Sequence, residues 1–164
     1  MKWGRAAIVP GLVLLLSGCV AKYDPLFVGG DVSTPVIGWR DCPGSEPDGV
    51  AEVGLYEGAD EATADSPGEL IWHIKATQGN LSKRISIGET PAGFTSLLPM
   101  TTQLVSGTTY AVRTNMSSDG GVSGFVTFRP EQLAAGQLVF GDGNEESPEQ
   151  YRSRDNEDFG CFAA

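Results

Sequence analysis

The fold class is decided by one stretch of the chain, Glu69-Leu70-Ile71-Trp72-His73-Ile74-Lys75-Ala76-Thr77. Its side chains alternate between a mostly apolar set and a more polar set, and this period of two predicts a half-buried β-strand. We expect the inward set to be Leu70, Trp72, Ile74 and Ala76, and the outward set to be Glu69, Ile71, His73 and Lys75. On the outer face, His73 should stand in solvent or pair across the sheet.

Similar short segments recur on both sides of this stretch, separated by glycine, proline, asparagine or aspartate. This spacing, without any long stretch of helical period, is typical of an all-β fold. The expected strands are 32–39, 50–56, 69–77, 83–88, 96–103, 109–116, 122–129 and 137–140, with one helical turn that starts at Pro130 and ends at Gly136. We therefore predict a single antiparallel β-sandwich of about 7–8 strands. It should occupy residues 34–141 and be followed by a loose acidic tail over residues 142–164.

A second stretch narrows the expected architecture: Leu104-Val105-Ser106-Gly107-Thr108-Thr109-Tyr110. It resembles the fibronectin type III pattern, in which a leucine, a turn and a tyrosine lead into the penultimate strand. The resemblance implies a tyrosine corner at Tyr110, with its ring in the core, its hydroxyl bonded to backbone, and Leu104 as its packing partner. Trp72 falls on the third expected strand, as in immunoglobulin domains. We therefore expect a fibronectin type III-like or immunoglobulin-like β-sandwich.

The N-terminal end has the layout of a secretory signal. Lys2 and Arg5 precede an apolar run over residues 6–16, which is shorter than the roughly 20 residues that a membrane-spanning helix needs. Leu16-Ser17-Gly18-Cys19 then resembles the lipobox of bacterial lipoproteins, and the general layout is similar to that of small actinobacterial lipoproteins of unknown function. The resemblance implies that residues 1–18 are a lipoprotein signal peptide and that Cys19 is acylated. An ordinary signal peptide with an incidental cysteine is the alternative.

The segment that follows Cys19 is expected to be a tether. Residues 19–33 would comprise the lipidated N-terminus and a flexible linker, because they show no clear period and contain Pro25 and Gly29-Gly30. The lipobox implies a position in the bacterial cell envelope, on the exported side of the membrane. Val20 is not the aspartate associated with inner-membrane retention, which implies the outer membrane if the organism has one.

Charge and length bound the class of partner. The chain has 11 basic and 21 acidic residues, and its formal net charge of −10 becomes −12 once Lys2 and Arg5 leave with the signal peptide. Such a charge disfavours nucleic-acid binding and electrostatic adhesion to anionic lipids, since both need basic patches. Removing residues 1–18 leaves 146 residues, which is a usual length for one domain.

With Cys19 assigned to lipid, Cys42 and Cys161 remain as an even pair in an oxidising compartment. We predict a disulfide between them, which would hold the tail against the start of the domain. The single histidine and the absence of any Cys-x-x-Cys motif leave no zinc site in the sequence.

The remaining candidates for chemistry are a calcium loop and a sugar platform. Asp142, Asn144 and Glu146 place oxygen ligands at alternate positions, as at the start of a calcium loop, but serines occupy the positions of the loop's glycine and last glutamate. A solvated acidic tail is the expectation there. Trp39, Tyr56 and Phe94 lie near expected strand ends, where exposed rings would stack on sugars. Core packing is the expectation for these rings, because a sandwich core can use all of them, and the sugar platform is the alternative.

These observations favour a non-catalytic, membrane-anchored envelope lipoprotein that acts as a binding or assembly module. Its partner would be an envelope protein or a glycan, and no cofactor is expected. The alternative is a calcium- or glycan-dependent adhesion or wall-binding domain. An enzyme with a carboxylate-based site is a third, disfavoured reading, because no convergent set of catalytic residues is visible and the sequence contains no Gly-x-Ser-x-Gly, His-Glu-x-x-His or Ser-x-x-Lys motif.

Overall fold

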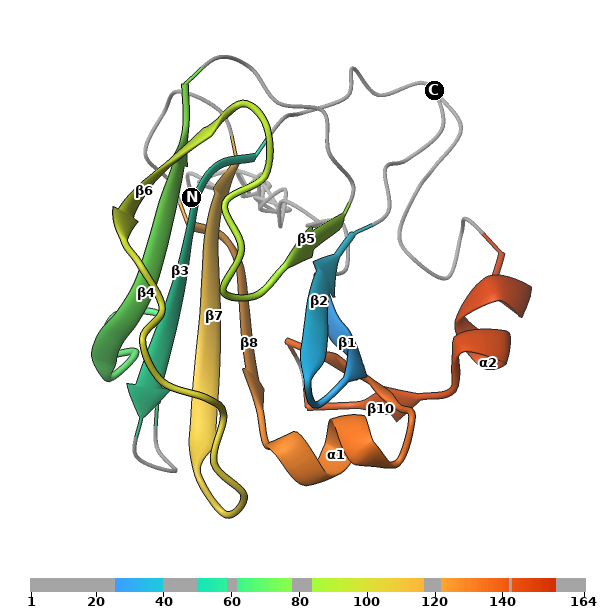
Figure 1. The fold of residues 1–164 in the computed structure, drawn as a ribbon. Coiled ribbons are helices and arrows are strands. Elements are labelled where there is room, and N and C mark those ends of the chain that lie inside the picture. Colours follow the sequence, from blue (N-terminus) through green and yellow to red (C-terminus); the bar gives the residue numbers. More distant parts are fainter. Residues whose placement is uncertain are drawn as a thin grey trace, which may run out of the picture.

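The structure is a computed structural model that describes residues 26–39, 50–58, 62–77, 84–116, 122–141 and 143–155. Within these ranges the chain forms ten strands and two short helices (Figure 1). The strands make two five-stranded antiparallel sheets that face each other, so the all-β class is confirmed. The strand number is ten rather than the predicted seven or eight, because β1 and β10 of one sheet come from segments expected to be linker and tail.

The first sheet has the strand order β10-β9-β1-β2-β5. Its members are β1 (Phe27–Asp31), β2 (Thr34–Gly38), β5 (Arg84–Ser86), β9 (Leu138–Phe140) and β10 (Glu145–Glu146). The predicted strand over residues 32–39 is instead the second arm of a β1–β2 hairpin. The hairpin turns at Val32-Ser33, where the Asp31 side chain accepts a hydrogen bond from the Ser33 backbone N–H at 2.9 Å, as turn-forming aspartates do.

The second sheet has the strand order β6-β4-β3-β7-β8. Its members are β3 (Val50–Gly58), β4 (Glu69–Ala76), β6 (Phe94–Leu98), β7 (Thr109–Met116) and β8 (Val122–Phe128). The helices are α1 (Pro130–Ala134), which follows β8, and α2 (Pro148–Ser153) near the C-terminal end. The helical turn predicted after Pro130 is therefore confirmed, and Gly136 ends it with a positive φ of 73°.

The main core fills the space between the two sheets. Trp72 and Ile74 of the stretch that decides the fold have exposed fractions of 0%, and Val28 of β1 is equally buried from the opposite sheet. The largest fully buried side chains also include Tyr110, Phe128, Ile37 and Leu55. Each Å² of apolar surface that these side chains remove from water stabilises the folded state by about 25 cal/mol.

A β-bulge reverses the predicted faces of Leu70 and Ile71. The β3–β4 register pairs Leu55 with Trp72 and then Tyr56 with Leu70, which leaves Ile71 as the extra residue. Ile71 therefore packs against the core. Leu70 lies on the outer face, where its Cδ1 is 3.2 Å from the position that a Cβ on Gly54 would take. Strict alternation fails here because the bulge inserts one residue into one strand only.

The expected tether overlaps the first sheet. Residues 19–33 were expected to be flexible, but β1 lies inside this range and pairs with both β2 and β9. The reason is burial: Leu26, Phe27 and Val28 are only 7%, 6% and 0% exposed. The two glycines that suggested a linker are part of the strand, and Gly29 provides room for the Leu138 side chain.

The tail beyond residue 141 also carries structure, in β10 and α2. Tyr151 of α2 packs on a second, smaller apolar cluster on the outer face of the first sheet, made by Phe27, Leu138 and Phe140. The ring centroids of Tyr151 and Phe27 are 5.1 Å apart in an edge-to-face arrangement. In Figure 1, α2 lies beside β10, at the side of the molecule away from the second sheet. The acidic tail is therefore ordered as far as α2 by aromatic packing.

Candidate functional site

A cavity lies at the end of the sandwich that carries the β1–β2 turn. Its volume is about 580 Å³, which is within the usual size range of ligand sites. Three segments line it: the β1–β2 hairpin around its turn, the start of the β5–β6 connection, and the β6–β7 connection at Met100 and residues 102–104. The lining residues are Asp31, Val32, Ser33, Pro35, Ile87, Gly88, Glu89, Met100, Thr102, Gln103 and Leu104. We call this hollow the end cavity.

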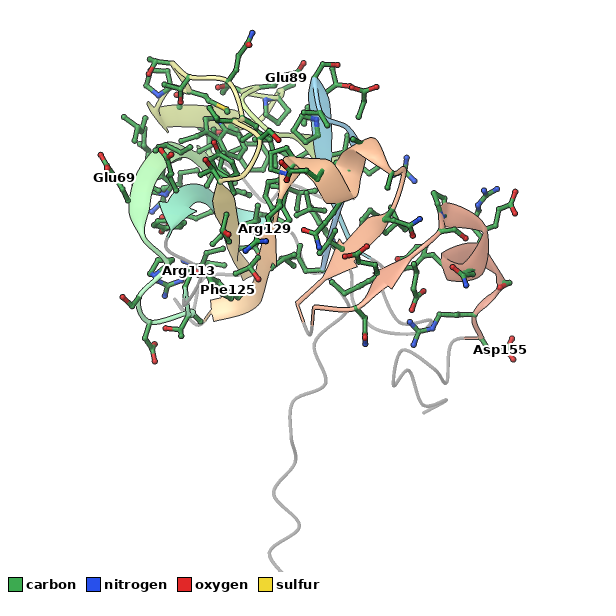
Figure 2. All side chains as sticks on the ribbon, turned by 90° about the horizontal axis from the view of Figure 1, so that it is seen from below. Glu69, Glu89, Arg113, Phe125, Arg129 and Asp155 are labelled. Atoms are coloured by element: carbon green, nitrogen blue, oxygen red, sulfur yellow. The ribbon has the colours of Figure 1, made fainter. Side chains whose placement is uncertain are left out.

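Two carboxylates, Asp31 and Glu89, stand at the rim of the end cavity, and both residues are exposed. Figure 2 views the molecule from below and shows Glu89 beside the β1–β2 hairpin. Asp31 Oδ1 accepts hydrogen bonds from Ser33 N at 2.9 Å and from Ser33 Oγ at 2.8 Å. These two donors lower the pKa of Asp31 below its ordinary value. Asp31 is therefore held as a charged acceptor.

The β6–β7 connection is held in place at its far end. The Tyr110 hydroxyl accepts a hydrogen bond from Val105 N at 2.9 Å, and the ring is 2% exposed beside Phe128. Leu104 is partly buried against the same core cluster. This is the arrangement that the tyrosine-corner resemblance implied. The Glu131 carboxylate of α1 holds the same connection, because it accepts hydrogen bonds from Ser106 Oγ and from Gly107 N.

His73 of β4 lies on the outer face of the second sheet and is not among the residues that line the end cavity. Its Nε2 is 3.8 Å from Glu52 Oε2, and Lys75 Nζ is 2.6 Å from Glu52 Oε1. Asn115 Nδ2 donates to Glu52 at 3.5 Å. The Lys75 hydrogen bond is the main cause that lowers the pKa of Glu52. His73 thus pairs across the sheet, which was one of the two expected roles.

The calcium candidate has two described members, Asn144 and Glu146, while Asp142 lies outside the described residues. Glu146 Oε1 pairs with Arg154 Nη1 at 2.6 Å. Its neighbour Glu145 accepts a hydrogen bond from Gln132 Nε2 at 2.7 Å. Among the described residues, no three His, Cys, Asp or Glu side chains come together in a way that would hold a metal ion.

Two of the three rings weighed for a sugar platform lie in the core instead. Trp39 and Phe94 are 6% and 8% exposed and belong to the main core cluster. Tyr56 is half-buried, and its ring lies over Gly54 on the outer face. Rings near strand ends turned inward because the sandwich closes over them, which is the core-packing expectation.

Cys19, the lipidation candidate, lies outside the described residues, as do Cys42 and Cys161 of the expected disulfide. Acylation and disulfide formation therefore stay predictions. In the part of the chain that the structure describes, neither helix has the length and apolarity to cross a bilayer.

Comparison with known proteins assigns the chain to no family. No family model matches the chain, and no curated protein or solved structure is significantly similar to it.

Sequence reasoning missed the end cavity, although Asp31 offered a signal. Asp31-Val32-Ser33 between two apolar segments is a turn sequence, in which the aspartate side chain bonds the backbone two residues on. Reading it as a hairpin turn would have placed a strand before it. The other lining segments come together only through the pairing of β2 with β5 and the path of the β6–β7 connection.

Proposed function

We propose that this chain is a non-catalytic, lipid-anchored binding or assembly module of the bacterial envelope. One observation carries the proposal: β1 begins at Phe27, eight residues after Cys19, and ends at the turn that lines the end cavity. A segment of that length reaches at most about 28 Å. A lipid on Cys19 would therefore keep the start of β1 close to the membrane.

The direction of β1 then sets which surface a partner meets. The strand runs from Phe27 at the anchored end to Asp31 at the far end. The end cavity is lined by Asp31 and the turn after it. An anchored molecule would thus present the cavity away from the attachment point of the chain.

The chemistry of the end cavity favours binding over catalysis. A general base works best with a pKa near the working pH. Hydrogen bonds from Ser33 instead lower the pKa of Asp31. The one imidazole of the chain, His73, is engaged with Glu52 on the outer face of the second sheet rather than in the cavity lining.

We also infer an immunoglobulin-like or fibronectin type III-like sandwich. The strand neighbours β1-β2-β5 and β4-β3-β7-β8 correspond to the orders A-B-E and C′-C-F-G of such domains. The Tyr110 hydrogen bond at the start of β7 supports this assignment. β6, β9 and β10 are additions outside β4 and β1, and the buried Trp72 lies on β4 rather than on the strand C equivalent, β3.

Fractionation of cells that express the chain tests the anchor. The wild-type chain should enter the membrane fraction and the detergent phase of a two-phase extraction, and Cys19→Ala should leave both. Cys42→Ala is the matched control, since it removes a cysteine without touching the lipobox. Retention of Cys19→Ala in the membrane fraction would show that the anchor proposal is wrong.

A further inference from the structure

We propose that the end cavity binds an extended peptide segment in which lysine or arginine alternates with aliphatic residues. The inference rests on the proposed function in one respect, since it names the partner class for the same surface. It is carried by three features of the cavity: the charge of its rim, the apolarity of its floor, and a stretch of backbone along one side that bonds no other described residue.

The rim charge calls for a cation. Asp31 and Glu89 are the charged side chains among the described lining residues, and none of these lining residues is basic. The whole chain carries a formal net charge of −10, so the surrounding field has the same sign. A cationic partner is attracted by both, and the attraction also raises its association rate.

The floor calls for aliphatic contacts. Ile87 is 7% exposed and Pro35 is buried, while Met100, Leu104 and Val32 are partly buried around them. Methionine adapts its shape to different apolar partners because its side chain is unbranched and flexible. A polyamine or a bare cation would leave this floor unused, whereas a side chain such as valine would cover it.

The third feature is a stretch of backbone that makes no hydrogen bond to another described residue. Residues 100–104 make no backbone hydrogen bond to any residue that the structure describes. Exposed N–H and C=O groups of this kind pair with an added extended segment, and side-chain pockets then give specificity. The connection is fixed just beyond this stretch, where Val105 N donates to the Tyr110 hydroxyl. Ordering residues 100–104 around a ligand should therefore cost less free energy than ordering a loop that is not fixed at its end.

The other described hollows fit a cationic ligand less well. A hollow of about 510 Å³ near α1 contains Arg129 together with Glu131 and Glu145, so its charges are mixed. A third of about 500 Å³ shares Asp31 and Val32 with the end cavity, and its remaining lining is Gly30, Leu133, Ala134 and Gly136. The end cavity alone among these three combines two carboxylates with a broad apolar floor.

The test is fluorescence anisotropy with a labelled eight-residue peptide of alternating lysine and valine, titrated with the full chain purified in a non-ionic detergent. Two further probes separate the contributions: alternating lysine and serine, and alternating glutamate and valine. The lysine–valine peptide should bind more tightly than either. The double variant Asp31→Asn, Glu89→Gln should weaken its binding about threefold to tenfold, which is the range for two partly exposed ion pairs. Asparagine keeps the oxygen that Ser33 bonds.

The matched control is Glu57→Gln, Glu69→Gln, which removes the same charge from two exposed residues that face each other on β3 and β4. Its binding should equal that of the wild type. Equal weakening by the two double variants, equal binding of the lysine–valine and lysine–serine probes, or no binding at millimolar chain would each overturn the proposal. The assay needs no membrane, so a Cys19→Ala chain that stays in the membrane fraction but still binds the probe contradicts the anchor alone.

Discussion

Gly38→Ala should destabilise the protein, because the ring of Phe27 occupies the space that the new methyl group needs. A Cβ on Gly38 would lie 2.3 Å from Phe27 Cζ and less than 3 Å from both Cε atoms. Overpacking of this kind costs about 1–3 kcal/mol. The backbone at Gly38 does not have a positive φ, so alanine can adopt it. Alanine also restricts the unfolded chain, and this offsets the loss by about 0.4–1 kcal/mol in the free energy of unfolding. The expected net loss is about 0.5–2 kcal/mol.

Gly38→Ala should stabilise the protein instead of destabilising it when the Phe27 ring is absent. In a Phe27→Ala background the space over Gly38 is open, and only the gain from the unfolded state remains, about 0.4–1 kcal/mol. The coupling free energy between the two positions should therefore be about 1–3 kcal/mol. Phe27→Ala alone should be destabilising, because it removes the ring on which Phe140 and Tyr151 pack.

Urea unfolding of four chains starting at residue 20 measures this cycle: wild type, each single variant and the double variant. Trp39 and Trp72 are both buried, so tryptophan fluorescence reports loss of the main core. If Gly38→Ala costs the same free energy of unfolding in both backgrounds, the ring does not lie over Gly38. The account of the aromatic cluster that orders the tail would then be wrong.

Three further predictions concern the core, a surface pair and the cysteines. Tyr110→Phe should lower the free energy of unfolding by about 1–3 kcal/mol, because it leaves a partly buried backbone N–H unpaired; an unchanged urea midpoint would contradict this. Glu52 has a lowered pKa when folded, so its contribution to stability is full above its ordinary pKa of 4.5 and is lost as the pH falls below that value. Glu52→Gln should therefore flatten the acid limb of a stability–pH curve, as should removal of its partner in Lys75→Met, and wild-type slopes in both would count against the pair. Finally, a thiol assay on the denatured, unreduced protein should find Cys42 and Cys161 blocked; two reactive thiols would show that the predicted disulfide is absent.

β4 is a strand that the sequence predicted well because its two faces differ. It has nearly the expected bounds, and the buried Trp72 and Ile74 alternate with the half-buried His73 and the exposed Lys75. β1 was missed because both of its faces are buried at Phe27 and Val28, and because glycines follow at once. A short run that is apolar on both faces carries no period, so only its pairing partners reveal it.

The candidate site was beyond prediction from sequence for a different reason. The tyrosine corner is local, since Val105 and Tyr110 are five residues apart, so one short stretch of sequence is enough to predict it. The end cavity instead brings Asp31 and Glu89 together from segments separated by more than fifty residues. Their meeting depends on the β2–β5 ladder, which no local pattern specifies.

The place of β1 within its sheet has a mechanical consequence for a protein that is held by its N-terminus. With Cys19 lipidated as proposed, tension on the lipid would enter the domain at Phe27 and run along β1. β1 is an interior strand, paired with β2 on one side and with β9 on the other. A pull along the strand therefore loads two hydrogen-bonded ladders in shear, and Tyr151 presses on the same point from outside. Breaking the hydrogen bonds to one neighbouring strand would not free β1. The ladders to β2 and β9 must both break before the domain unfolds from this end.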